Sequence, residues 1–77
     1  MRLKVFSPLS EMIGFKEREL KLKGNLRIRD IIRDIPELAK VELGEFVVAL
    51  NKTKVVSLDT EVGDEDELWI LPPIDGG

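Results

Sequence analysis

The residues best suited to chemistry in this sequence lie at its end, where residues 71–77 read LPPIDGG. Gly76 and Gly77 have no Cβ, so their backbone can enter a passage too narrow for any other residue. We therefore expect the carboxylate of Gly77 to be a chemical handle that is delivered into the active site of another protein. Two terminal glycines can also arise by chance, as a disordered end or as a cloning remnant. The pair alone leaves these explanations open.

Composition removes most other routes to catalysis. The chain has 77 residues and contains neither cysteine nor histidine, which excludes disulfides, thiolate nucleophiles, the usual zinc sites and imidazole bases. Without histidine, the hydroxyl side chains have no base to activate them. At this length we expect a single domain over residues 1–77 with one modest core. We predict no bound cofactor, no metal site and no activity as a stand-alone enzyme.

Charge and hydropathy argue against nucleic-acid and membrane partners. The 12 basic and 15 acidic residues give a net charge of −3, whereas phosphate backbones require a concentrated basic surface. The cluster Arg27, Arg29 and Arg33 is interleaved with Asp30 and Asp34, which favours an ion-paired, solvated face. The longest apolar run, residues 46–50, is too short to cross a bilayer, and no signal peptide follows Met1. We expect a cytoplasmic protein that is monomeric when free.

Hydrophobic spacing predicts the elements that would position the tail. Residues 2–6 and 19–23 alternate between polar and apolar types, which predicts two strands of an antiparallel hairpin with a long loop. Leu3 and Val5 should point inward. The loop would hold an apolar connection over residues 9–13 and a turn at Gly14, and the second strand would end at residues 24–25.

The middle of the chain changes to a helical period. Isoleucines at positions 28, 31, 32 and 35 predict an amphipathic helix with no serine or threonine to cap its start. The helix should end near Ile35 because Pro36 follows. Residues 36–40 are predicted to form a separate helical turn, closed by Gly44.

The remaining segments complete a mixed sheet. Residues 46–50 and 55–58 are predicted strands joined by a tight turn at 51–54. Residues 59–66 form an acidic loop whose spacing does not fit an EF-hand, so we expect a solvated turn and no calcium site. The last strand, 67–71, is stopped by Pro72 and Pro73. This order predicts an α+β fold in which one main helix packs on a sheet, with a flexible tail from about residue 72.

Alternation also predicts apolar side chains on the face of the sheet away from the helix. Phe6, Trp69 and Leu71 would share that face if the first and last strands are neighbours. The patch would then lie where the tail leaves the sheet. It is either a docking surface or is covered by the loop after Phe6 or by the short helix.

The chain resembles the ubiquitin-like sulfur carriers of the MoaD/ThiS group, most of all the small subunit of molybdopterin synthase. The match follows the element order of the whole chain and is most specific at residues 49–51, 62–65 and 71–77. The resemblance implies a β-grasp (ubiquitin-like) fold, with a mixed four- to five-stranded sheet on one main helix. Asp75 departs from the family, which more often has a small or hydroxylic residue at this position.

The resemblance also implies a function and two partners. A ubiquitin-activating-like adenylyltransferase would use ATP to adenylate the carboxylate of Gly77, and a persulfide sulfur would then displace AMP to leave a thiocarboxylate. The tail would insert into the large catalytic subunit of molybdopterin synthase and donate its sulfur to a pterin precursor. Gly76 would be the second narrow link. The family's contacts to its activating enzyme would fall on Phe6 and Leu71. Together with the apolar face and the tail, this gives the predicted partner-binding residues Phe6, Trp69, Leu71, Pro72, Pro73, Ile74 and Asp75.

Other functions remain open at this point. The same activated Gly77 would serve a ubiquitin-like modifier that is conjugated to lysines of target proteins. A carrier could also supply sulfur for thiamine synthesis or tRNA thiolation. In a simple binding module the terminus would be incidental, and deletion of Gly76 and Gly77 would leave its activity intact.

Overall fold

The computed structural model describes residues 1–41, 46–52 and 54–72. In chain order its elements are β1 (Arg2–Val5), α1 (Leu9–Ile13), β2 (Glu17–Glu19), β3 (Leu26–Arg27), α2 (Ile28–Arg33), α3 (Pro36–Ala39), β4 (Val47–Leu50), β5 (Lys54–Val56), β6 (Glu61–Val62) and β7 (Glu67–Leu71).

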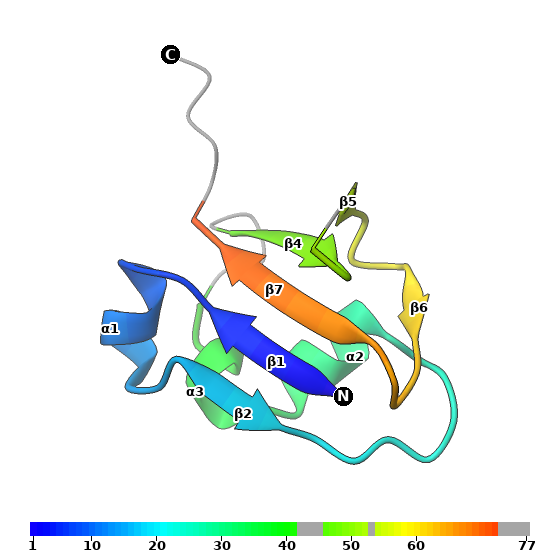
Figure 1. The fold of residues 1–77 in the computed structure, drawn as a ribbon. Helices are drawn as coiled ribbons and strands as arrows, with labels where there is room; N and C mark the ends of the chain where they lie inside the picture. Colours follow the sequence, from blue (N-terminus) through cyan, green and yellow to red (C-terminus); the bar gives the residue numbers. More distant parts are fainter. Residues whose placement is uncertain (42–45, 53, 73–77) are drawn as a thin grey trace.

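Strand β7 lies at the centre of a five-stranded sheet with the order β2-β1-β7-β4-β5. It pairs in parallel with β1 and antiparallel with β4, so the sheet is mixed as predicted. Figure 1 shows α2 and α3 on one side of this sheet. We call the opposite side the open face. The strand that leads into the tail is thus held by a neighbour on each edge.

The core lies between the sheet and α2. Leu3, Leu68 and Ile70 are each 0% exposed, which confirms the predicted inward side of the first and last strands. The isoleucines at 28, 31, 32 and 35 are all buried, as their helical spacing predicted. The α-helix itself ends at Arg33, two residues earlier than expected. The separate helical turn after it is confirmed as α3, with Pro36 in its first turn.

Backbone carbonyls replace the missing side-chain cap of α2. The Ile28 amide donates to the Thr60 carbonyl at 3.0 Å, and the Arg29 amide donates to the Leu58 carbonyl at 2.9 Å. These bonds satisfy two of the amides that a helix start leaves unpaired. Next to these bonds, β3 pairs with β6 in a second, small sheet, which also joins the segment before α2 to residues 61–62. The prediction of a plain turn over residues 59–66 was therefore wrong, because β6 lies within that segment.

The hairpin of β1 and β2 is confirmed, but its second strand was misplaced. Arg2 pairs with Glu19 at one end of the ladder, so the strand occupies Glu17–Glu19 and ends where residues 19–23 were expected to begin it. The Leu20 amide still donates to the Met1 carbonyl, at 2.8 Å. Leu22 then turns its amide to the Asp64 carboxylate, also at 2.8 Å. Leu20 and Leu22 alternate with polar residues because their side chains pack against the core, although this segment does not form a strand.

The connection between these two strands contains a short helix that periodicity did not predict. Residues Leu9–Ile13 form α1, and the buried Leu9 anchors it on the core. The expected turn at Gly14 is confirmed, with φ of 92° and a 3.0 Å bond from its amide to the Ser10 carbonyl. Five residues are too few to display a helical period, which is why the segment read as a connection.

The turn between β4 and β5 is tied to the start of β7. Asn51 and Lys52 have φ of 53° and 70°, the positive values of a tight hairpin turn. The Asn51 side-chain amide donates to Asp66 at 3.1 Å, and its oxygen accepts from the Glu67 amide at 2.9 Å. This confirms the predicted hairpin, although its second strand is Lys54–Val56 and not 55–58. The expected closure at Gly44 lies outside the described residues. The network fixes where the central strand begins.

Asp66 and Asp64 make this end of the fold sensitive to acid. A hydrogen bond from the Gly63 amide lowers the pKa of Asp66, and one from the Leu22 amide lowers the pKa of Asp64. A carboxyl whose folded-state pKa is lowered stabilises the fold fully above its ordinary pKa of about 4 and loses that contribution as the pH falls through the folded value. We therefore expect the urea midpoint to fall as the pH drops below about 4.

The variant Asp66→Asn tests this source of acid sensitivity. It should lower the urea midpoint at pH 7. The further decrease of the midpoint on acidification should be smaller than in the wild type, because one titrating carboxylate is gone. Glu65→Gln is the control, since Glu65 is exposed and forms none of the side-chain hydrogen bonds found within the described ranges. Equal acid losses in the wild type and in Asp66→Asn would assign the sensitivity to other groups.

Candidate functional site

The candidate site begins where β7 leaves the sheet. Leu71 is still paired with Val47 of β4, and both Leu71 and Pro72 are half-buried. Figure 1 shows this end of β7 emerging at the margin of the sheet. The predicted site residues Pro73, Ile74, Asp75, Gly76 and Gly77 lie outside the described residues.

The structure brings together the predicted aromatic and aliphatic residues beside this exit. The rings of Phe6 and Trp69 have centroids 4.9 Å apart and an interplanar angle of 52°, a favourable tilted arrangement. The Phe6 amide donates to the Ile70 carbonyl at 2.9 Å, which holds the end of β1 against β7. Phe6, Trp69 and Leu71 are all half-buried, so the segment after Phe6 does not seal them from solvent. Their role in docking stays a prediction.

The apolar surface is wider than the sequence analysis expected. Val47 and Ala49 lie opposite Leu71 and Trp69 across the β4–β7 ladder, and Val55 lies opposite Ala49 on β5. Paired residues share a face of a sheet, so Val47 and Val55 extend the surface toward the β5 edge, whereas Ala49 on the same face is only 6% exposed. Val55 is 56% exposed. We call the whole set the sheet patch: Phe6, Val47, Ala49, Val55, Trp69 and Leu71.

A signal for the wider patch was present in the sequence. Residues 47–50 and 55–56 are apolar on both sides of the strand, which indicates strands with two buried or contacting faces. Taken alone, that run predicts only the position of a strand. Val47 and Ala49 lie opposite Leu71 and Trp69 because β4 is a neighbour of β7 in the sheet. The apolar run does not indicate which strand will be that neighbour.

The other half of the open face is charged, and several of its side chains contact one another. The Arg2 Nε atom lies 4.0 Å from one carboxylate oxygen of both Glu17 and Glu19. The Trp69 indole donates to Glu67 at 2.6 Å, and this hydrogen bond lowers the pKa of Glu67. Glu67 therefore stays ionised at neutral pH and fixes the indole at the border between the charged half and the sheet patch.

Neither a metal-binding cluster nor a membrane-length helix occurs in the described part of the chain. Within residues 1–41, 46–52 and 54–72 no three acidic side chains are grouped so that they could hold a metal ion. None of the helices over the same residues is long and apolar enough to cross a membrane.

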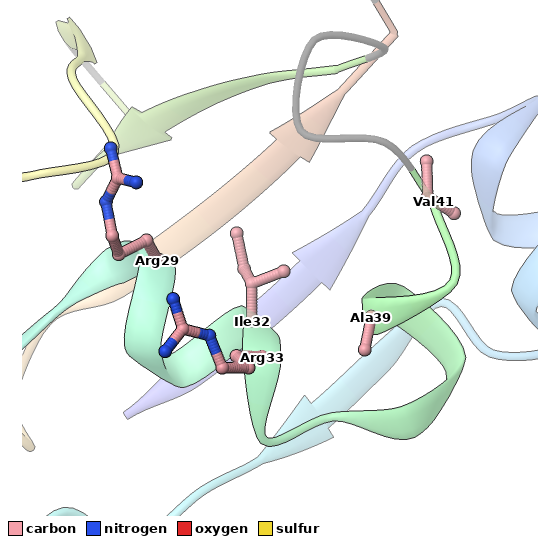
Figure 2. A pocket seen from close by; sticks show the side chains of 5 residues that line it. All are labelled: Arg29, Ile32, Arg33, Ala39 and Val41. Atoms are coloured by element: carbon pink, nitrogen blue, oxygen red, sulfur yellow. The ribbon is translucent and has the colours of Figure 1, made fainter.

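A separate pocket of about 140 Å³ opens in the helix layer, away from β7. Figure 2 shows Arg29, Ile32 and Arg33 projecting from α2, with Ala39 of α3 and Val41 completing the lining. Arg29 Nε already forms an ion pair with Asp59 at 2.7 Å, although the angles are not those of a hydrogen bond. The volume is well below that of a typical cofactor site. This pocket does not extend the candidate site.

Comparison with known proteins places the chain among small sulfur carriers. The profile of the ThiS family matches residues 3–77. The sulfur carrier protein TtuB of Thermus thermophilus is 34% identical over 65 residues, which are 80% of this chain and 88% of that protein.

Solved structures share the same fold over nearly their whole length. A putative molybdopterin converting factor, subunit 1, from Pyrococcus furiosus is 28% identical, with a TM-score of 0.76 and 95% of each chain covered. A chain from the complex of subunits 1 and 2 of the molybdopterin-converting factor of Helicobacter pylori is 29% identical, with a TM-score of 0.65. That match covers 99% of this chain and 96% of the other.

Proposed function

Because this chain belongs to the ThiS family and is a sulfur carrier of the ThiS/MoaD kind, we propose that it is the small subunit of a molybdopterin synthase. Its fold is the ubiquitin-like β-grasp, with a mixed five-stranded sheet. The observation that carries the finer proposal is the likeness to two molybdopterin-converting factor chains at 28% and 29% identity, one of them in a complex of subunits 1 and 2.

The proposed reaction takes place on the carboxylate of Gly77. A carboxylate is a poor electrophile until one of its oxygens becomes part of a good leaving group. An adenylyltransferase partner would join that oxygen to the α-phosphorus of ATP and release pyrophosphate. The terminal sulfur of a protein persulfide then attacks the carbonyl carbon and AMP leaves. The product is an acyl disulfide that joins Gly77 to the cysteine of the persulfide protein. A second thiol attacks that cysteine sulfur and gives up its proton: a disulfide forms between the two thiol sulfurs, the original S–S bond breaks, and the thiocarboxylate leaves with the electron pair.

The fold determines where the tail begins relative to the surface on which a partner would dock. Central strand β7 is fixed at its start by Asn51 and along both edges by β1 and β4. Pro72 has a fixed φ and no backbone amide to donate, so it cannot continue the ladder that β7 forms. The sheet patch lies at the base of this exit. A partner that docks on the patch would receive the tail at a defined distance.

Single-turnover transfer tests the molybdopterin assignment. The protein is first loaded as the thiocarboxylate and then mixed with the large subunit of molybdopterin synthase and the cyclic pterin precursor. We expect loss of the sulfur from the carrier together with formation of the dithiolene pterin. Parallel mixtures contain the sulfur-accepting enzymes for thiazole formation and for tRNA thiolation. Transfer in one of these, with the carrier left loaded beside the large subunit, would contradict the molybdopterin role and retain the carrier role.

A further inference from the structure

A pocket of about 280 Å³ adjoins the sheet patch where β1 runs into α1 and β2 begins. Phe6 lines this pocket and is also the ring that contacts Trp69. Lys4, another lining residue, is the register partner of Trp69. The pocket is therefore continuous with the sheet patch. Its volume is slightly below the usual range for small-molecule sites and suits a single side chain of a docked protein.

The polar groups of this pocket are mostly donors. Lys4 and Lys16 contribute two ammonium groups, and Ser7 and Ser10 contribute two hydroxyls. Ser10 is only 4% exposed, and its Oγ lies 3.4 Å from the Oγ of Ser7, a long hydrogen bond. Such a pair can reorient to donate to an anion. The side-chain chemistry favours a negatively charged oxygen as the occupant.

The lysines also lack close countercharges. Among the ion pairs of the described residues, neither Lys4 nor Lys16 has a carboxylate within 4.0 Å. Glu17 is the acidic lining residue, and Arg2 already lies 4.0 Å from it. Glu67, which faces the same side, accepts the indole hydrogen bond of Trp69. The pocket is thus locally positive in a chain whose net charge is −3.

We infer that this pocket receives an aspartate or glutamate side chain of the adenylyltransferase that activates Gly77. The inference rests on the proposed carrier function, but not on the molybdopterin branch, because every acceptor pathway requires the same activation. The partner surface would be apolar opposite the sheet patch and would place one carboxylate at its edge. The basic pocket would set the orientation of docking, and the sheet patch would supply most of the contact area.

Charge reversal in the pocket tests this inference. The variant Lys4→Glu/Lys16→Glu is compared with Lys23→Glu/Lys40→Glu, whose two lysines are exposed and do not line the pocket. Both pairs change the net charge equally, so long-range effects of the total charge cancel. Affinity for the adenylyltransferase is measured by titration at low and high salt, with circular dichroism to establish that each variant is folded. The variant Lys4→Gln/Lys16→Gln removes the two positive charges without adding negative ones. It therefore separates loss of attraction from repulsion between the new glutamates and the partner's carboxylate.

We expect the pocket pair to weaken binding by about tenfold or more at low salt, with a smaller loss at high salt. The control pair should bind within about twofold of the wild type. Equal losses in both pairs, or none in the pocket pair, would overturn the inference. If wild type is still activated on Gly77 in that case, the carrier function stands and only the pocket assignment fails. If wild type neither binds nor becomes activated, the carrier function fails as well.

Discussion

Deletion of Gly77 is expected to reduce sulfur loading by at least about 100-fold, although Gly76 then provides a glycine carboxylate of the same kind. The reason is that the carboxylate of the shortened tail no longer reaches the same position in the partner's active site. One residue of extended chain spans about 3.3–3.6 Å, and misplacement of a reacting group by about 1 Å can already cost about 100-fold. Loading is measured as thiocarboxylate formed with the adenylyltransferase, ATP and a persulfide donor.

The fold should survive this deletion, because every described element ends at or before Leu71. Circular dichroism and the urea midpoint are therefore expected to match those of the wild type. Gly77→Ala is the companion variant, since it keeps the chain length and adds one Cβ to the narrow segment. It should load less than the wild type and more than the deletion. Full loading of the deletion variant would show that the reactive carbon does not have to be that of Gly77.

Replacement of Trp69 by alanine is expected to weaken binding of the adenylyltransferase by about 30-fold or more. Trp69 lies near the middle of the sheet patch, between Phe6 on one side and Ala49 on the other. Central tryptophans of this kind commonly contribute about 2 kcal/mol or more when truncated, and this corresponds to about 30-fold in Kd. Titration calorimetry with the adenylyltransferase would measure the change.

Two further variants separate docking from folding in this experiment. Trp69→Phe keeps an aromatic ring against Phe6 and removes the hydrogen bond to Glu67, so it should bind much more tightly than Trp69→Ala. Leu26→Ala truncates a side chain that is 39% exposed in β3, outside the sheet patch, and should bind as the wild type does. If Trp69→Ala is folded and binds as tightly as Leu26→Ala, the sheet patch is not the docking surface for this enzyme.

The parts of the fold with a strong local period could be predicted from sequence. The isoleucine spacing of residues 28–35 and the alternation in residues 2–6 and 67–71 led to α2, β1 and β7 with the right faces buried. In these segments the buried positions are apolar almost without exception. The pattern and the packing therefore carry the same information.

The missed elements depend on contacts between distant segments. Strands β3 and β6 are two residues each, and they are defined by their mutual pairing and by the amides of α2 that bond across to Leu58 and Thr60. In β2 the residue on the helix side is Arg18, which bonds Glu37 of α3 through both carboxylate oxygens, at 3.3 and 2.9 Å. A polar residue at an inward position hid the strand from an analysis based on apolar alternation.

The candidate site was predictable in part for the same reasons. Alternation placed Phe6, Trp69 and Leu71 on one face, and the pairing of β1 with β7 brings them together. Val55 and the Lys4–Lys16 pocket were missed because they come from segments that approach only through the sheet order and the path of α1. The role of the tail is inferred from the sequence and from membership of the ThiS family.

The most direct measurement of the central claim is the intact mass of the full chain after incubation with the adenylyltransferase, ATP and a persulfide donor. We expect a species heavier by the difference between one sulfur and one oxygen, with the change located at Gly77 by fragmentation and lost on hydrolysis. Omission of ATP should abolish it. An unchanged mass under conditions in which the partner consumes ATP, or conjugates that join Gly77 to lysines with no sulfur-bearing species, would contradict the account.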